Sequence, residues 1–362
     1  MKLLHCADLH LDAKMESGLS PADARARRVE LLMTFSRLVE LAESRGVEAV
    51  LLAGDLFDTA RVSEKTRRFV GETVVSHPAL RFLYLPGNHD ENVPPLFPDG
   101  TVPPNFFAFP SDGWASIELN DQVTVSGTGA LDQPGIFDRL PCPPSSVFHI
   151  VLLHGQVVRG EETGRDRIPL RLLQGRGIDY LALGHEHSMR IESLDRRGTW
   201  AYAGCPEGRG FDECGVKGCL LIDTLADAAQ RVTFIPTAKR TLHEIPVAID
   251  NCLGFSDILD AVKTAVSHLP REDMVKVVLT GHVSPDLVRD VEHIHQWLSE
   301  RFLLCRVKDE CRLAIRKEDY QNDISLKGEF IRTVLSSRLS EDQKQRTIEY
   351  GLRALRGEEV DA

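Results

Sequence analysis

The sequence has no long apolar run, and this absence excludes an ordinary membrane-spanning helix. No stretch approaches the roughly 18 consecutive apolar residues that are needed to cross a bilayer. The first residues, MKLLHCADLH, reach His and Asp before the apolar region of a secretory signal could develop. We therefore expect a cytoplasmic protein that does not use a membrane.

Cysteines with metal-binding spacing and an excess of positive charge are also lacking. None of the 8 cysteines forms a CxxC pair, so neither a disulfide framework nor a zinc motif is indicated. The formal net charge of −11 argues against a protein that coats nucleic acid nonspecifically, because such binding needs Lys and Arg to neutralise phosphates. A nuclease is still allowed, since carboxylates gathered around metal ions raise the acidic count.

The length of 362 residues predicts two domains, and the apolar share of 42% is typical of a globular protein. The first 240 residues alternate short apolar runs with helical patterns, as α/β domains do. Ser20 followed by Pro21 predicts the start of a helix that ends at Gly46. The proline-rich residues 91–110 are predicted to form a long surface loop. Five apolar runs are predicted as buried strands, at residues 2–6, 47–53, 81–85, 148–153 and 180–183.

The pattern changes after about residue 240 and predicts a small α+β domain over residues 241–320. Strands are expected at 242–249, 274–279, 303–307 and 312–315, with helices at 256–268 and 285–301. Two further helices are expected within 321–362, the second opening with a capping box formed by Ser340 and Gln343. The apolar residues Phe330, Ile331, Val334, Leu335 and Leu339 fit either a partner surface or packing on the protein's own body.

Metal-binding and proton-donating side chains follow all five predicted strands of the first domain. Ligands in α/β folds gather at the carboxyl ends of strands, and residues two apart in an extended segment share one face. A lone histidine at a strand end is usually structural, but five strand ends that each supply a ligand predict a metal site. The side chains are Asp8 and His10, then Asp55, then Asn88 and His89, then His154, and finally His185 and His187.

Three other features allow weaker interpretations. Asp58 is interpreted as a turn or helix-capping residue rather than a ligand. His282, His293 and His295 are interpreted as ordinary histidines, because no acidic loop accompanies them. Arg209 could bind a substrate phosphate, or it could pair with Asp212 or Glu213.

The ordered motifs Asp-x-His, Gly-Asp-x-x-Asp, Gly-Asn-His-Asp, His and Gly-His-x-His resemble the calcineurin-like metallophosphoesterase superfamily over residues 1–237. The segments HCADLHLD, YAGCPEGRGFDECGVKGCLLID, DISLKGEFIR and GLRALRGEEV are similar to its SbcD and YhaO branch of double-strand-break repair nucleases. The resemblance implies a four-layer α-β-β-α sandwich over residues 1–240, a cap over 241–320 and partner-binding helices over 321–362.

The resemblance also implies a site with two divalent metal ions, expected to be Mn²⁺. Asp8, His10 and His187 would hold one ion, Asn88, His154 and His185 the other, and Asp55 would bridge them. His89 would help to protonate or position the leaving oxygen, and Arg209 is a candidate substrate-binding residue.

We therefore predict a DNA exonuclease and endonuclease that acts with an SbcC-like coiled-coil ATPase, and the family analogy adds a homodimer. Two alternatives stay open from the residues themselves. One is a phosphomonoesterase or cyclic-nucleotide phosphodiesterase for small molecules. The other is a non-catalytic scaffold, although scaffolds of this kind lose ligands and this ligand set is complete.

Overall fold

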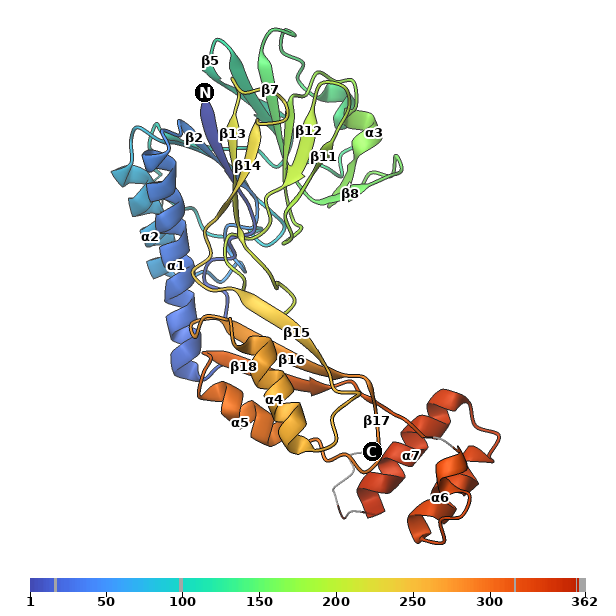
Figure 1. Cartoon of the computed structure of the whole chain (residues 1–362). Coiled ribbons are helices and arrows are strands. Elements are labelled where there is room, and N and C mark those ends of the chain that lie inside the picture. Colours follow the sequence, from blue (N-terminus) through green and yellow to red (C-terminus); the bar gives the residue numbers. More distant parts are fainter. Residues whose placement is uncertain (16–17, 98–99, 316, 356, 358–362) are drawn as a thin grey trace. The chain divides into compact units, whose positions relative to one another are not determined.

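Residues 1–15, 18–97, 100–315, 317–355 and 357 are described by the structure, a computed structural model. The chain divides into two units, Met1–Thr241 and Leu242–Ala362 (Figure 1). The end of the predicted C-terminal segment, residues 358–362, lies outside the described residues. Within the described parts of both units, no helix is at once long enough and apolar enough to cross a membrane.

Two six-stranded sheets form the centre of the first unit. The first has the order β14-β13-β1-β2-β3-β4 and the second the order β11-β12-β10-β7-β6-β5. The first sheet consists of β1 (Lys2–Cys6), β2 (Ala49–Ala53), β3 (Arg81–Leu85), β4 (Phe106–Ala108), β13 (Gly218–Asp223) and β14 (Val232–Pro236). The second consists of β5 (Ala115–Asn120), β6 (Val123–Gly127), β7 (Phe148–His154), β10 (Tyr180–Gly184), β11 (Arg190–Ser193) and β12 (Thr199–Tyr202).

Helices cover the outer faces of the two sheets. In β2, Leu51 lies in the core between the sheets, whereas Leu52 packs with the residues of α1 (Pro21–Ser44) and α2 (Glu64–Ser76). In β7, Leu152 lies between the sheets, whereas Val151 packs with η1 (Phe137–Arg139) and α3 (Leu170–Leu173). Successive strand residues point to opposite faces, so apolar strands bury both. These four layers confirm the predicted α-β-β-α sandwich.

The sequence located the central strands better than the edges of the sheets. α1 begins at Pro21, and the Ser20 side chain accepts from the Asp23 backbone N–H, as the capping signal predicted. The predicted loop at 91–110 was wrong in part, because β4 lies within it and pairs with β3. A three-residue edge strand is too short to show the alternation of apolar and polar residues that marks a strand. The short paired strands β8 (Gln156–Val158) and β9 (Arg167–Pro169) were not predicted for the same reason.

A buried ion cluster joins α1 to the end of the first unit. Glu30 accepts hydrogen bonds from Lys239 and Arg240, and Arg27 contacts both Glu30 and Glu207. Burial acts to raise the pKa of Glu30, but its hydrogen bonds with Arg240, Lys239 and Arg27 lower it to about 2. Residues far apart in sequence are therefore held by charge as well as by apolar packing.

The second unit is built on a parallel sheet of β15 (Leu242–Ala248), β16 (Met274–Thr280) and β18 (Leu304–Asp309). The other elements are α4 (Phe255–Val266), β17 (His282–Val283), α5 (Val291–Ser299), β19 (Arg312–Leu313), η2 (Lys317–Tyr320), α6 (Leu326–Leu335) and α7 (Glu341–Leu355). α5 begins later than predicted, because Asp290 caps it by accepting from the His293 backbone N–H. The predicted capping box of α7 is confirmed by reciprocal hydrogen bonds between Ser340 and Gln343.

The two C-terminal helices share the core of this unit. Ile331 and Val334 of α6, and Ile348 of α7, are buried in the same apolar cluster as residues of β16 and α4. Phe330 and Leu335 pack against that cluster, so packing on the protein's own body accounts for most of the predicted apolar pattern. Leu339 is 39% exposed.

The carboxyl ends of five strands of the first unit meet. β1, β2 and β3 are parallel neighbours in one sheet, and β7 and β10 are parallel neighbours in the other. β2 contacts both β7 and β10 across the interface between the sheets. Side chains that follow these five strands are therefore brought to one place.

Candidate metal centre

The loops that follow β1, β2 and β10 hold predicted ligands in unusual backbone conformations. Asp8, His10, Asp55 and His185 have φ angles of 52°, 44°, 50° and 107°. Positive φ is unfavourable for residues with a side chain and concentrates at functional sites. The loops after β1 and β2 stabilise each other, because the Asp8 N–H donates to the Gly54 carbonyl and the His10 N–H to the Asp55 carbonyl, both at 3.0 Å.

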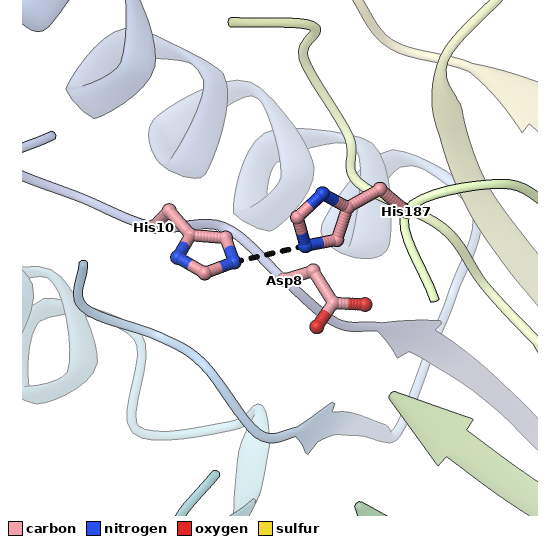
Figure 2. Close-up of side chains that lie close together, drawn as sticks. All are labelled: Asp8, His10 and His187. Atoms are coloured by element: carbon pink, nitrogen blue, oxygen red, sulfur yellow. Dashed lines mark hydrogen bonds between the residues drawn. The ribbon is translucent and has the colours of Figure 1, made fainter. Parts of the chain in front are cut away.

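Asp8, His10 and His187 form the first cluster with metal-ligand geometry (Figure 2). The Nε2 atoms of the two histidines lie 3.2 Å apart, and the Asp8 carboxylate lies next to them. Two ring nitrogens this close either share a proton in a hydrogen bond or direct both lone pairs at a metal ion. The donor set of two imidazoles and a carboxylate suits a borderline divalent metal.

Asn88, His154 and His185 form a second group. The Asn88 Oδ1 atom lies 3.0 Å from His154 Nε2 and 3.4 Å from His185 Nδ1. His154 Nδ1 lies 2.8 Å from the carbonyl oxygen of Ala53. A carbonyl only accepts, so Nδ1 carries the proton and the lone pair of Nε2 faces the site when the ring is neutral.

Asp55 lies between the two groups. Its Oδ2 atom is 3.3 Å from His154 Nε2 and 3.7 Å from His10 Nε2, and its Oδ1 accepts from the His89 N–H at 2.9 Å. Burial acts to raise the pKa of Asp55, but the hydrogen bond and charge of His154 lower it to about 2. Burial likewise acts to lower the pKa of His154, and Asp55 raises it to about 9. Burial raises the pKa of Asp8 to about 7.

Three glycines make room for this packing. A Cβ atom on Gly54 would come within 2.1 Å of His154 Nδ1, and one on Gly87 within 2.2 Å of Asp55 Oδ1. A Cβ on Gly184 would come within 1.9 Å of the Ala53 carbonyl oxygen. Each of these glycines is therefore required for close approach of the ligand loops.

His89 differs from the seven other predicted side chains because it is exposed. Its Nδ1 atom lies 2.6 Å from the Asp58 carbonyl oxygen. Its ring packs edge-on against the ring of His10, with the two ring centroids 4.8 Å apart. The carbonyl fixes the proton on Nδ1, so Nε2 is the nitrogen available to other groups. The structure thus places His89 beside the ligand clusters.

The capping interpretation of Asp58 was incomplete. Its carboxylate Oδ1 lies 3.2 Å from His10 Nδ1 and 3.0 Å from Arg209 Nη1. Arg209 also pairs with Glu213. Of the two carboxylate partners predicted for Arg209, Asp212 and Glu213, the structure selects Glu213, which accepts several of its hydrogen bonds.

Two carboxylates support the site in a way that the sequence did not predict. Glu213 Oε1 lies 2.7 Å from His187 Nδ1, and this hydrogen bond raises the pKa of His187. Asp90 is buried and accepts from the backbone N–H groups of Leu56, Phe57 and Gly87 at 2.9–3.1 Å. The only sequence signal for either was its place within a motif, directly after His89 or at the end of GRGFDE.

A family model of calcineurin-like phosphoesterases matches residues 1–189. The chain is similar to the metallophosphoesterase YhaO of Bacillus subtilis, at 29% identity over 61% of this chain and 57% of YhaO. It is also similar to the SbcD component of the nuclease SbcCD of Escherichia coli K12, at 24% identity over 96% of both chains. The double-strand-break repair protein Mre11 of Aeropyrum pernix is 25% identical over 79% of this chain and 73% of its own length.

Proposed function

Because the chain belongs to the calcineurin-like phosphoesterase family, and is thus a metal-dependent hydrolase of phosphate esters, we propose that it is a two-metal nuclease of DNA double-strand-break repair. One observation carries the proposal. Seven donor side chains from five strand ends converge on two adjacent groups that share Asp55.

The residues present fit two divalent ions. Asp8, His10 and His187 would hold one, Asn88, His154 and His185 the other, and Asp55 would contact both. The close approach that Gly54, Gly87 and Gly184 allow, and the buried carboxylates, support this assignment, because they bring charged donors together out of water. Such a pair of ions, when bound, lowers the pKa of an attacking water and neutralises the phosphate oxygens. Nitrogen and oxygen donors of this mix favour Mn²⁺ over Mg²⁺.

His89 would act on the leaving oxygen. The Asp58 carbonyl holds the proton of Nδ1, so a protonated His89 presents its second proton on Nε2. The ring is exposed and can reach a phosphodiester that lies over the ligand groups. Donating this proton neutralises the alkoxide as the P–O bond breaks, and a neutral His89 can only accept a hydrogen bond there.

DNA is the proposed substrate because of the relatives that align with most of the chain. The SbcD component of the SbcCD nuclease aligns with 96% of it, including the second unit, which a minimal phosphatase does not need. The test compares Mn²⁺-dependent hydrolysis of linear double-stranded DNA with that of an aryl phosphate. We expect cleavage of DNA, abolished by Asp55→Asn and unchanged by Asp121→Asn, which alters an exposed carboxylate. Hydrolysis of the aryl ester alone would instead support a small-molecule phosphoesterase.

We further propose that the α6 and α7 region binds an SbcC-like ATPase. Although most apolar residues of these helices pack inside the second unit, Ile324, Leu326 and Tyr350 are 100%, 72% and 48% exposed. A contiguous patch of such exposed apolar side chains would mark an interface. Leu326→Asp should reduce co-purification with the ATPase encoded by the same genome while leaving DNA cleavage by the isolated chain unchanged. Equal recovery of the ATPase would refute this surface.

A further inference from the structure

Two proposed ligands of one ion, His10 and His187, each have a carboxylate oxygen within 3.2 Å of Nδ1. Glu213 Oε1 lies 2.7 Å from His187 Nδ1, and Asp58 Oδ1 lies 3.2 Å from His10 Nδ1. An ionised carboxylate only accepts, so it favours the tautomer with the proton on Nδ1 and the lone pair on Nε2. The two Nε2 atoms are those that face each other at 3.2 Å beside Asp8 (Figure 2).

Arg209 joins these two carboxylates. Its Nε and Nη2 atoms donate to Glu213 Oε1 at 3.1 and 2.6 Å, and its Nη1 atom donates to Asp58 Oδ1 at 3.0 Å. Nη2 also lies 3.3 Å from His187 Nδ1, but both groups are donors in this tautomer, so the shorter contact with Glu213 is the hydrogen bond. The planar guanidinium thus connects the carboxylate beside His187 to the carboxylate beside His10.

The position of the Glu213 carboxylate is fixed by its own loop. Its Oε2 atom accepts from the Arg209 backbone N–H at 2.6 Å, and the Glu213 N–H donates to the Gly210 carbonyl at 2.9 Å. The Glu213 side chain is 2% exposed and that of Arg209 is 19% exposed. Because the loop holds the carboxylate independently of the histidine, the carboxylate can orient the imidazole ring.

We propose that Glu213, Arg209 and Asp58 form a positioning unit that holds His10 and His187 in the tautomer and orientation needed to bind one ion. This role rests on the proposed metal centre. It assigns the guanidinium of Arg209 to the two carboxylates, where three of its N–H groups are already used, rather than to a substrate phosphate. The unit comes from two separate chain segments, residue 58 and residues 209–213, and acts on ligands from two others.

The test titrates the metal-free full-length chain with Mn²⁺ in a calorimeter. Outer hydrogen-bond partners of ligand histidines typically change metal affinity by about 10- to 100-fold. We expect Glu213→Gln to weaken the binding of one of the two ions by about this factor, because its amide N–H₂ would face the backbone N–H of Arg209. Arg209→Lys keeps the charge but cannot span both carboxylates, so it should weaken the same ion, with the KM for DNA unchanged. Nitrogen-15 spectra of the metal-free protein should show His187 losing its single tautomer in Glu213→Gln.

The matched control is Arg197→Lys, which alters another arginine that pairs with a carboxylate, 2.7 Å from Asp179. It should leave both Mn²⁺ affinities at the parent value. Binding of both ions by Glu213→Gln and Arg209→Lys as tightly as by the parent would overturn the positioning role. A raised KM for DNA with unchanged Mn²⁺ affinity in Arg209→Lys would overturn it too, and would assign Arg209 to the substrate phosphate. A parent protein that binds no Mn²⁺ would refute the metal centre itself and this role with it.

Discussion

Replacement of Asp90 by alanine should separate the loops that carry Asp55 and Asn88. The Asp90 carboxylate accepts from three backbone N–H groups at 2.9–3.1 Å and is 6% exposed, so alanine would leave three buried donors without this partner. A hydrogen bond to a charged group contributes about 1.5–3 kcal/mol, and three bonds that share one carboxylate add less than threefold. Burial raises the pKa of Asp90, which offsets part of the gain. We expect a loss of roughly 3–5 kcal/mol in the free energy of unfolding.

Asp90→Asn should lower the free energy of unfolding by roughly half as much as Asp90→Ala. Asp90 Oδ2 accepts from Leu56 and Gly87, and an amide oxygen can keep both bonds, but the N–H₂ group would then face the Phe57 N–H. Urea denaturation followed by tryptophan emission measures the difference. A Trp297→Phe background leaves the emission of the first unit alone, since that unit contains the other two tryptophans. A change below about 1 kcal/mol for Asp90→Ala would refute the reasoning, as the exposed Asp121→Ala should change stability by less than about 0.5 kcal/mol.

Three other variants test separate parts of the structure. Gly184→Ala would place a methyl 1.9 Å from the Ala53 oxygen, so calorimetry should show weaker Mn²⁺ binding, whereas Gly113→Ala meets open space and should bind normally. The low pKa of Glu30, about 2, stabilises the fold above about pH 4.5, and this contribution is lost as the pH falls towards 2. Glu30→Gln should therefore lower the free energy of unfolding by about 1–2 kcal/mol at pH 7, after allowance for solvent screening. It should also make the melting temperature fall less steeply as the pH is lowered. A melting temperature that falls with pH as steeply as in the parent would contradict this. His89→Gln should reduce kcat by about 10²- to 10⁴-fold with unchanged Mn²⁺ affinity, and a parent-like kcat would exclude it as the acid.

The central strands and the ligand loops could be predicted from sequence because their signals are local. A run such as that of β2 is apolar throughout, and its end is marked by the polar pair Gly54 and Asp55. The edge strands are short or partly polar, and their pairing depends on neighbours distant in the chain. β14, for example, is recognisable only beside β13. Local signals therefore predicted the loops that carry the candidate ligands but not the whole of either sheet.

The contact between Asp58 and Arg209 could not be predicted for a related reason. Asp58 and Arg209 are 151 residues apart, and no spacing rule connects them. Asp58 follows a strand in a turn-like sequence, which is typical of a capping residue, and its contact with His10 appears only when the two loops pair. A ligand is recognisable by its residue type at a strand end, whereas a residue that orients a ligand can be any polar residue of any segment.

The eight side chains that follow the strands are separated by their surroundings rather than by their chemistry. His89 and His154 both present Nδ1 to a backbone carbonyl, so each keeps Nε2 for its function. The Nε2 atom of His154 lies between Asn88 and Asp55, which favours a cation, whereas the ring of His89 is exposed, as its proposed role at the leaving oxygen requires. The same contact with a backbone carbonyl therefore fits the proposed ligand, whose ring is buried among carboxylates, and the proposed acid, whose ring is exposed. Both residues are histidines, so their proposed roles differ only because their rings lie in different surroundings. For this reason the sequence alone, without the family resemblance, could not divide the eight side chains into ligands and acid.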